Sequence, residues 1–529
     1  MSREEVNAET DVPPSVEGTV CKNLLTLVVE SVNFTLPVRL SLINPQSHTS
    51  FRSSSIHIYL PRGFRRGEKL REFDLIVIGS GSGLDVAVAA SQSGKNVAII
   101  EKGPLGGTCL NRGCIPSKML IHSADVVEVL RDANQFGVNI KGFEIDFNRI
   151  VRRVREMVDT ESLEIENNLK SSTNPVLFKG EGRFVDLKTL EVNGERIRGE
   201  KILIAAGSRP EVPNVPGLKE SGYITSDEAL RLETQPRVLT VLGGGYIAAE
   251  LAHFFGSLGS QINIIQRRNV LLPNEDESIS SHFTHIFSKR YNVFTGYVPL
   301  MVSKSGNNYS VKVESLETKE QRVISSDQLL VAAGRKPNSD LLDLERTGVK
   351  TDSRGFIVVD EFLRTNVDGI FALGDIIGRY PFKHAANLEA EYAYHNIMNP
   401  DSMIPVDYTA IPHAVFTNPQ IAGVGKTEQQ LKAEGVDYLV GFYRYADTGM
   451  GKAIGEDEGF VKFLVERRTG KILGCHILGH DASVLIHEVL VAMRCGEGTL
   501  ENIRKTVHIH PALSEVIDRA AASLYEPNQ

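Results

Sequence analysis

Residues 73 to 84 read Phe73-Asp-Leu-Ile-Val-Ile-Gly79-Ser-Gly81-Ser-Gly83-Leu84, an apolar run that ends in three glycines at alternate positions. The run is apolar except for Asp74, which is typical of a strand buried on both faces of a parallel sheet. An Ala/Val-rich stretch to Gly94 predicts a helix, and residues 97–100 predict a second strand that Glu101 closes. This order of strand, glycine loop, helix, strand and acid is the fingerprint of a dinucleotide-binding fold.

The glycines and the acid of this fingerprint have defined physical roles. Glycines permit a tight turn and let the backbone approach a pyrophosphate, while the acid accepts hydrogen bonds from ribose hydroxyls. The N-terminus of the following helix offers unpaired N–H groups to the phosphates. Leu84 stands where a third glycine is usual, and Gly83 lies one place earlier. We therefore expect the packing of this helix against the strand to be altered.

The same pattern occurs a second time, beginning with an apolar strand at residues 237–242. Gly243-Gly-Gly245-Tyr246-Ile-Ala-Ala-Glu250 then opens a helix to about residue 258, and residues 261–265 form the paired strand. Two such folds suggest two dinucleotides, with electrons passing from one to the other. The position of the ribose-binding acid holds Gln266, followed by Arg267 and Arg268. Arginines at this point can hold the 2′-phosphate of NADP; the alternative is that they are solvated charges at a strand end.

Cys109 and Cys114 lie between the first fold and a predicted helix, in the stretch Gly106-Gly-Thr-Cys-Leu-Asn-Arg-Gly-Cys-Ile-Pro-Ser-Lys118. A structural disulfide is unusual in a chain without an export signal, because cytosolic thiols are kept reduced. A metal site needs further ligands, and none lies nearby in the sequence, so we expect no metal. Two unconnected cysteines and a redox-active pair remain as alternatives. The two nucleotide folds favour the redox pair, because they supply a source and a sink for its electrons.

Length and composition restrict the class of protein. The 529 residues predict three or four domains. A net charge of −8 gives no reason to expect nucleic acid as a partner. No apolar run approaches the roughly 18 residues of a membrane span, and five cysteines, an odd number, argue against a secreted disulfide scaffold. We therefore expect a cytoplasmic protein that interacts with no membrane, in which Cys21, Cys475 and Cys495 are free buried thiols.

Residues 1–71 differ from the rest of the chain. They open on an acidic stretch with Glu4, Glu5, Glu9 and Asp11, which fits neither a secretory signal nor an Arg-rich transit peptide. No motif is present in this segment. We interpret it as a dispensable extension of unknown role, or as sequence upstream of a true start near Leu70.

Taken together, these motifs resemble those of the class I pyridine nucleotide-disulfide oxidoreductases, which are flavoprotein disulfide reductases. The resemblance covers about residues 72–525 and includes Thr365 to Asp375 and His510-Pro-Ala-Leu-Ser-Glu515. It implies an α/β fold with two Rossmann-like domains for FAD and NAD(P), and a C-terminal α+β domain that forms a homodimer. The implied segments are residues 72–223 and 346–406 for FAD, 224–345 for NAD(P), and 407–525 for dimerisation.

The resemblance also implies a role for each residue of the redox site. Cys109 would be the interchange thiol that meets the substrate, and Cys114, placed deeper, would face the flavin. Lys118 would lie near the flavin, paired with Glu250. His510 would be the acid/base, because imidazole titrates near neutrality, and Glu515 would orient its ring. This histidine would reach the disulfide of the other subunit, whereas His508 would be structural.

Cofactor contacts are implied in the same way. An acid at a strand end, such as Asp375, is placed to hold a ribityl chain, although an Asp before a helix can also be an N-cap. The implied FAD contacts are Gly79, Gly81, Gly83, Glu101, Lys102, Gly107, Thr108, Lys118, Ala206, Gly207, Gly374, Asp375 and the backbone N–H of Ala385. The implied NAD(P) contacts are Gly243, Gly245, Tyr246, Ile247, Glu250, Gln266, Arg267 and Gly334.

Within the family, Ser117, a tail without paired cysteines and the patterns of residues 100–120 and 505–520 favour dihydrolipoyl dehydrogenases. Such an enzyme would use NAD to reoxidise dihydrolipoamide on a lipoyl-bearing protein of a 2-oxo-acid dehydrogenase or glycine-cleavage system. Ala248, Ala252 and Arg267 are instead similar to NADPH-dependent reductases of low-molecular-weight disulfides, such as glutathione or mycothione reductases. A third alternative is a redox-silent regulatory flavoprotein, against which the joint presence of the cysteines and His510 argues.

Overall fold

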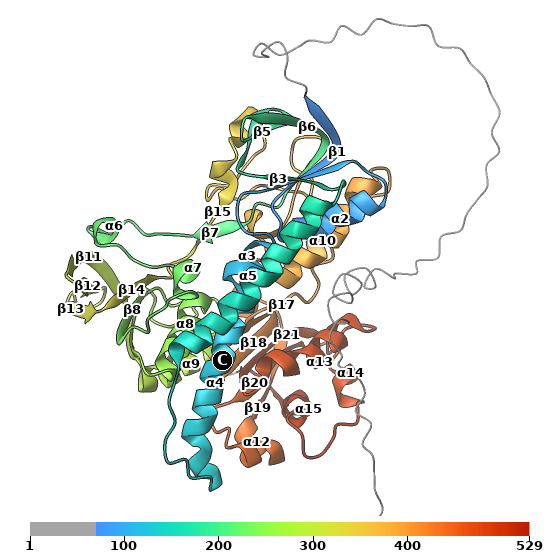
Figure 1. Ribbon diagram of the computed structural model, residues 1–529. Coiled ribbons are helices and arrows are strands. Elements are labelled where there is room, and N and C mark those ends of the chain that lie inside the picture. Colours follow the sequence, from blue (N-terminus) through green and yellow to red (C-terminus); the bar gives the residue numbers. More distant parts are fainter. Residues whose placement is uncertain (1–69, 528–529) are drawn as a thin grey trace, which may run out of the picture. The chain divides into compact units, whose positions relative to one another are not determined.

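The computed structural model describes residues 70–527. The predicted extension over residues 1–71 therefore lies outside the described residues except for its last two, and so does Cys21. None of the helices between residues 70 and 527 is long and apolar enough to cross a membrane. The described residues form several sheets with helices packed against them, and they confirm the predicted α/β class with an additional C-terminal α+β unit (Figure 1).

The first nucleotide fold is built on a sheet in which β1 is flanked by β2 and β6 in parallel. Its order is β3-β2-β1-β6-β5-β4, with β16 beside β6. The strands are β1 (Arg71–Ile78), β2 (Val97–Glu101), β3 (Val176–Lys179), β4 (Gly182–Asp186), β5 (Thr189–Val192), β6 (Glu195–Ile204) and β16 (Ile370–Ala372). Ile76 and Val77, which point to opposite faces, are both fully buried. Val77 packs under α2 (Gly83–Gln92) and α10 (Lys383–Met398), and Ile76 packs in a second core with residues of β4 and β5.

The close packing of helix α2 against strand β1 occurs at Gly83, one residue before Leu84. A Cβ added at Gly83 would lie only 2.9 Å from Ala205 Cβ and from Val77 Cγ1. Gly83 therefore provides the close approach of helix and strand that the usual third glycine supplies one residue later. Strand β6 ends at Ile204, and the separate strand β7 (Ser208–Pro210) pairs with β15 (Arg335–Pro337).

The second nucleotide fold has the order β10-β9-β8-β14, all parallel. Its strands and helices are β8 (Val238–Leu242), α8 (Tyr246–Ser257), β9 (Gln261–Gln266), α9 (Glu277–Arg290), β10 (Asn292–Thr295) and β14 (Gln328–Val331). An antiparallel sheet is inserted before β14 and was not predicted from the sequence. It comprises β11 (Tyr297–Ser305), β12 (Asn308–Ser315) and β13 (Gln321–Ser326).

The C-terminal unit is an antiparallel sheet, β17-β18-β21-β20-β19-β22, with helices packed against it. Its strands are β17 (Pro412–Val415), β18 (Gln420–Gly425), β19 (Tyr438–Arg444), β20 (Phe460–Glu466), β21 (Ile472–Gly479) and β22 (Leu524–Tyr525). Its helices are α11 (Glu428–Glu434), α12 (Gly449–Ile454), α13 (Ala482–Arg494), α14 (Glu501–Arg504) and α15 (Glu515–Ala522).

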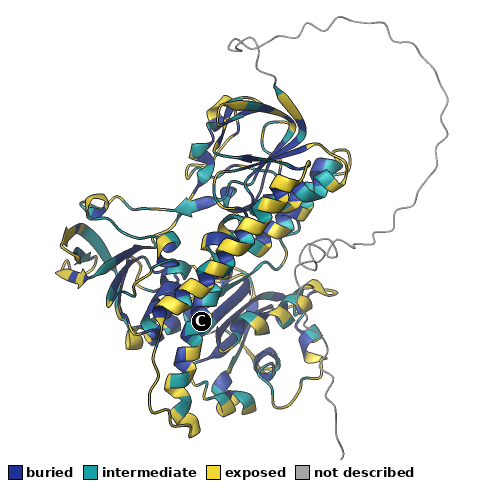
Figure 2. Cartoon of the chain, viewed as in Figure 1, coloured by how far each residue is buried: buried dark blue, intermediate teal, exposed yellow. Residues whose placement is uncertain are grey.

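Three helices follow the first nucleotide fold in the chain. They place the redox segment, residues 106–118, beside the second nucleotide fold and the C-terminal unit. They are α3 (Gly107–Arg112), α4 (Cys114–Asp132) and α5 (Phe147–Ser171). Helix α4 packs against α8, and one hydrophobic core includes residues of α4, α5, α8 and β18. Figure 2 shows the resulting amphipathic pattern of α5, with exposed residues along its outer side. The redox segment thus lies where the three units meet.

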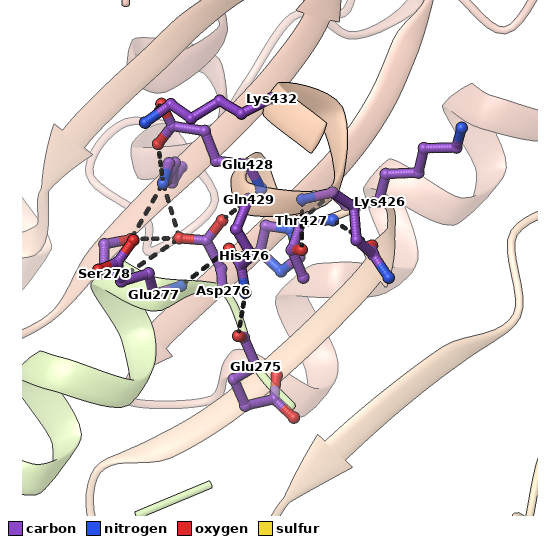
Figure 3. Close-up of polar contacts among 12 residues, drawn as sticks. Glu275, Asp276, Glu277, Ser278, Lys426, Thr427, Glu428, Gln429, Lys432 and His476 are labelled. Carbon is purple, nitrogen blue, oxygen red and sulfur yellow. Dashed lines mark hydrogen bonds and ion pairs between the residues drawn. The ribbon is translucent and has the colours of Figure 1, made fainter. Parts of the chain in front are cut away.

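A buried polar cluster joins the start of α9 to the C-terminal unit (Figure 3). Lys462 on β20 lies 2.6 Å from Asp276 Oδ1 and 2.6 Å from Glu428 Oε2, and both Lys462 and Asp276 are buried. Asp276 also accepts hydrogen bonds from the backbone N–H groups of Ser278 and Glu428. The side chain of Gln429 donates to the carbonyl of Glu275. The segment of residues 275–278 is therefore held by groups from the C-terminal unit.

We expect Lys462→Met to destabilise the protein by roughly 3–5 kcal/mol, because it leaves two carboxylates in the buried cluster without their cation. Urea unfolding followed by circular dichroism measures the change. Arg322→Met is the matched control: it breaks the pair with Glu320, in which both groups are exposed, so we expect little change in stability. Equal unfolding midpoints for the two variants would contradict the structural role of the cluster.

Candidate active site

The two cysteines lie on consecutive helices that Gly113 separates. Cys109 is inside α3, and Cys114 is the first residue of α4. A Cβ at Gly113 would lie 2.9 Å from the carbonyl oxygen of Thr108, so this turn needs a glycine. Both cysteines are free thiols in this structure. The local fold thus starts a helix at Cys114, where the backbone N–H groups favour a thiolate.

The two thiols have different acidities because they interact with each other. The hydrogen bond from Cys109 and the charge of Lys118 outweigh burial and lower the pKa of Cys114 to about 7. The same hydrogen bond, together with burial, raises the pKa of Cys109 above its usual value. When the reduced pair holds a single proton, this proton therefore stays on Cys109 and Cys114 is the thiolate.

One prediction about cysteine exposure is wrong, and one stays a prediction. In this structure Cys114 is exposed and Cys109 is half-buried, and that Cys114 faces the flavin remains a prediction. Cys114 is exposed because it begins α4, whose buried face starts only at Pro116 and Leu120. Cys475 is buried as expected, but Cys495 is exposed, because it follows the last residue of α13.

The predicted pair of Lys118 and Glu250 is present. Lys118 follows Cys114 by one helical turn on α4, and its Nζ lies 2.8 Å from each carboxylate oxygen of Glu250 on α8. Glu250 Oε1 also accepts a hydrogen bond of 3.0 Å from the backbone N–H of Phe416. The ring of Phe416 lies against the ammonium of Lys118, with Nζ 4.5 Å from the ring centroid. No sequence motif had pointed to Phe416.

The first glycine loop has the geometry that a bound pyrophosphate requires. Gly79 has a φ of +103°, and a Cβ there would lie 2.3 Å from the carbonyl oxygen of Ala205. A Cβ at Gly81 would meet nothing within 4 Å, so this side of the loop is open to a ligand. A Cβ at Gly107 would lie 2.6 Å from Gly81 Cα, which brings the start of α3 against the loop. No side chain caps the N-terminus of α2, so its N–H groups remain available to phosphates.

Glu101 is held at this loop by three hydrogen bonds. Its Oε2 accepts from the backbone N–H and the hydroxyl of Ser80, at 2.9 and 2.7 Å, and its Oε1 accepts from the N–H of Gly103. Thr108 and Lys102 are exposed nearby, and Lys102 lies 3.5 Å from Glu181. Glu101 therefore stands at the position from which a strand-end acid accepts from ribose hydroxyls.

The strand-end acid Asp375 lies close to the segment that links the two folds. Its Oδ2 accepts a hydrogen bond of 2.6 Å from Ser208, and Arg335 Nε lies 3.7 Å from the same oxygen. Asp375 lies inside a short 3-10 helix, η4 (Gly374–Ile376), whose N-cap is Leu373. The N-cap alternative for Asp375 is therefore wrong.

The other implied FAD contacts are backbone groups. Asn338 binds the carbonyls of Ala206 and Gly207 through its side-chain and backbone N–H groups. Ala385 is buried in the first turn of α10, and Ala386 is the first to bond back, to the carbonyl of Phe382. The N–H of Ala385 thus belongs to the turn whose donors have no intrahelical acceptor. This N–H is a donor suited to a hydrogen-bond acceptor of a flavin.

The second glycine loop repeats the geometry of the first. Gly243 has a φ of +121°, and a Cβ there would lie 2.2 Å from the carbonyl oxygen of Ala332. Gly245 is the N-cap of α8, without a side-chain cap, and a Cβ there would meet nothing within 4 Å. Gly334 (φ +153°) closes the neighbouring turn, and Ile247 follows Tyr246 in the first turn of α8. These residues fit a second dinucleotide.

Gln266 lies beside the second glycine loop, where a Cβ at Gly244 would be 2.9 Å from its Cγ and Cδ. It is buried, and its side-chain amide donates to the carbonyl of Val270 at 3.2 Å. Arg267 and Arg268 are exposed, and within residues 70–527 neither forms an ion pair. Strand β9 therefore ends in a residue that is not acidic, and among the described residues the two arginines that follow it form no ion pair.

Tyr246 contacts Glu275 and His413, two residues for which the sequence patterns predicted no role. Its hydroxyl donates to Glu275 Oε1 at 2.5 Å, and Glu275 Oε2 lies 2.7 Å from His413 Nε2. The ring of Tyr246 lies nearly parallel to those of His413 and Phe382, at centroid distances of 6.2 and 6.3 Å. Burial tends to raise the pKa of Glu275, but His413 and Tyr246 together hold it below its usual value. A charged carboxylate therefore fixes the tyrosine at the start of α8.

The predicted acid/base pair of His510 and Glu515 is also present, in the C-terminal unit. His510 Nδ1 lies 2.9 Å from Glu515 Oε1, and the Glu515 carboxylate also accepts from the N–H of Ala512. The hydrogen bond to His510 keeps the pKa of Glu515 below its usual value despite desolvation. His508, by contrast, is bound to Glu488 at 2.6 Å. In residues 70–527 no hydrogen bond joins His510 to either cysteine.

Comparison with known proteins agrees with this geometry. Residues 73–390 match the family model of pyridine nucleotide-disulphide oxidoreductases, and residues 411–521 match the dimerisation domain of the same family. Mycothione reductase of Mycobacterium tuberculosis is 37% identical over 86% of this chain and 100% of its own length. Mitochondrial dihydrolipoyl dehydrogenase of Pisum sativum is 36% identical over 88% of this chain and 93% of its own length. The HOCl-induced flavoprotein disulfide reductase RclA from Escherichia coli has a TM-score of 0.75 at 29% identity, covering 85% of this chain and 99% of that one.

The chain belongs to the pyridine nucleotide-disulphide oxidoreductase family. It is an FAD-dependent oxidoreductase that acts on sulfur groups, and its second cofactor is a nicotinamide nucleotide. The match to the dimerisation domain supports a homodimer.

The low pKa of Cys114 predicts the pH dependence of its reactivity. Because the pKa is lowered to about 7, the thiolate is present above this pH and is lost as the pH falls through it. We expect the rate of iodoacetamide alkylation of Cys114 in the reduced protein, followed by peptide mass spectrometry, to rise with a midpoint near pH 7. Lys118→Met should move this midpoint upward. A wild-type midpoint near the ordinary thiol value of about 8.5 would contradict the prediction.

Proposed function

We propose that this chain is an NADPH-dependent reductase of a low-molecular-weight disulfide. The observation that carries the choice of nucleotide is the position of Arg267 and Arg268 directly after Gln266, exposed and without an ion pair among residues 70–527. A 2′-phosphate needs cationic donors, and an acid at the strand end would repel it. NADPH is the nucleotide that usually supplies electrons to reductases. A site for its 2′-phosphate therefore also favours reduction of a disulfide as the direction of the reaction.

The proposed redox cycle uses the Cys109–Cys114 pair. When bound, FAD carries two electrons from the nicotinamide to the disulfide of this pair. The two cysteines then hold one proton, which stays on Cys109 because its hydrogen bond to Cys114 raises its pKa. Lys118 compensates the charge on Cys114, and Glu250 holds Lys118 in place.

The substrate steps are two thiol–disulfide exchanges. The Cys109 proton passes to His510, and the Cys109 thiolate attacks one sulfur of the substrate, which releases the first product thiolate. His510 returns the proton to this product. The Cys114 thiolate then attacks Cys109 Sγ, which restores the Cys109–Cys114 disulfide and releases the second product as a thiolate that takes one proton from solvent. Each cycle thus consumes one NADPH, one proton and one disulfide, and yields NADP⁺ and two thiols.

We propose that the partner subunit's His510 serves this site. The side chain of His510 is 74% exposed, and the flanking apolar residues Val507 and Ile509 are 95% and 77% exposed. Exposed apolar residues next to a reactive histidine are suited to an interface with a second copy. The match to the dimerisation domain supports this arrangement.

Oxidation of protein-bound dihydrolipoamide with NAD⁺ is the second candidate. It is supported by Ser117 in the Cys-Ile-Pro-Ser-Lys motif and by the 36% identity with a dihydrolipoyl dehydrogenase. The lipoyl-bearing protein would then be the partner.

A steady-state comparison distinguishes the candidates. The purified enzyme is assayed with NADPH or NADH against oxidised glutathione, mycothione and bis-γ-glutamylcystine, and with NAD⁺ or NADP⁺ against dihydrolipoamide. The proposal requires kcat/KM to be highest for NADPH with a low-molecular-weight disulfide. Efficient oxidation of dihydrolipoamide by NAD⁺, with little activity on these disulfides, would instead establish the second candidate.

The variant Arg267→Gln/Arg268→Gln tests the nucleotide site directly. We expect the KM for NADPH to rise by roughly 10- to 100-fold, because two charged contacts to the phosphate are lost, while the KM for NADH stays unchanged. Arg354→Gln, which removes an exposed arginine far along the sequence, is the control. A proportional rise for NADH would show that the arginines do not recognise the 2′-phosphate.

A further inference from the structure

Phe416 contacts both members of the Lys118–Glu250 pair. It follows directly after β17 in the C-terminal unit, whereas Lys118 is on α4 and Glu250 is on α8. Its backbone N–H donates to Glu250 Oε1 at 3.0 Å, and its ring lies 4.5 Å from Lys118 Nζ. An ammonium this close to a ring centroid is attracted to the negative π face. One residue therefore satisfies the carboxylate and the ammonium together.

The position of Phe416 is fixed by the turn that follows it. The Thr417 hydroxyl is buried and donates to the carbonyl of Pro419 at 2.6 Å. Arg290, at the end of α9, donates to the carbonyl of Asn418 at 2.8 Å and also forms an ion pair with Glu128 on α4. The turn is thus tied to the helix that carries Cys114, so Phe416 cannot move away from Lys118 independently.

The ammonium of Lys118 matters because of its place on α4. Lys118 lies four positions after Cys114, so the two are neighbours on one face of the helix. The groups that act on the Cys114 thiol are Cys109, Lys118 and Glu250. Lys118 is 34% exposed, so without a second contact its long side chain would exchange between Glu250 and solvent. The ring of Phe416 supplies that contact.

We propose that Phe416 is a positioning residue of the redox site, whose ring and backbone N–H hold the Lys118–Glu250 pair and thereby keep a positive charge beside Cys114. This places a determinant of thiol reactivity in the C-terminal unit of the same chain. The inference rests on the proposed role of Cys109 and Cys114 as the redox pair.

The test measures the pH midpoint of Cys114 alkylation in the reduced protein, which requires neither substrate nor turnover. We expect Phe416→Leu to raise the midpoint by on the order of half a pH unit and Phe416→Tyr, which keeps the π face, to restore it. Phe442→Leu, which removes a ring that packs on Phe460 in the same sheet, should leave the midpoint unchanged. An unchanged midpoint in Phe416→Leu, or a failure of Phe416→Tyr to restore it, would overturn the proposal.

A second measurement covers the case in which Phe416→Leu does not fold. Incorporation of pentafluorophenylalanine at position 416 keeps the size of the ring and reverses its quadrupole, so the same upward shift is expected without a packing defect. An unshifted midpoint in this protein would also overturn the proposal. Disulfide turnover of the wild-type enzyme is measured in parallel: an inactive enzyme with the expected midpoint shifts would refute the proposed function and leave the role of Phe416 intact.

Discussion

Cys109→Ser should lower disulfide turnover by about 10⁴-fold or more, because a serine hydroxyl cannot form the mixed disulfide that the exchange requires. Cys109 is the thiol whose pKa is raised by its hydrogen bond to Cys114, so it needs a base and then attacks the substrate. NADPH oxidation in the presence of the disulfide substrate is the measurement. Cys495→Ser, which replaces an exposed cysteine at the end of α13, is the control and should keep full activity.

Cys114→Ser separates the roles of the two thiols. This variant retains the attacking thiol but lacks the thiol that resolves the mixed disulfide. Incubation of the reduced variant with substrate should therefore give a stable adduct of one substrate half, which peptide mass spectrometry should locate on Cys109. If Cys109→Ser retained turnover, or if this adduct did not form, the order of the two cysteines would have to be reversed.

His510→Gln should lower kcat/KM for the disulfide by roughly 10²–10⁴-fold, the usual contribution of a general acid/base. Glutamine keeps a polar side chain near Glu515 but cannot accept the proton of Cys109. His508→Gln is the control, since His508 is bound to Glu488 instead of facing solvent. Equal losses in the two variants would mean that the His510 effect is structural.

A heterodimer tests whether His510 acts across the subunit interface. One subunit carries His510→Gln and the other carries Cys109→Ser, so that each alone is inactive. A site shared between subunits contains one intact combination in this heterodimer, and it should recover roughly half of the wild-type rate. Recovery would not occur if His510 served the cysteines of its own chain.

The sequence alone predicted those parts of the site that depend on residues close together in the chain. Gly79, Gly81 and Gly83 predict a tight loop, because the backbone of that loop requires glycine. Cys109 and Cys114 are set by a short turn through Gly113, and His510 and Glu515 are five residues apart. Such local geometry follows from the residue types and their spacing. The resemblance to a family then supplied the pairing of Lys118 with Glu250.

Only the tertiary structure decided which distant residues surround these groups. Phe416 against Lys118, Glu275 and His413 around Tyr246, and Lys462 with Asp276 are contacts between residues 29 to 298 positions apart, formed because α4, α8, α9 and the C-terminal sheet pack together. The exposure of Cys114 and the burial of Gln266 beside the glycine loop follow from the same packing. Sequence patterns indicate which face of an element is buried, but the partner on the other side is chosen by how whole elements pack.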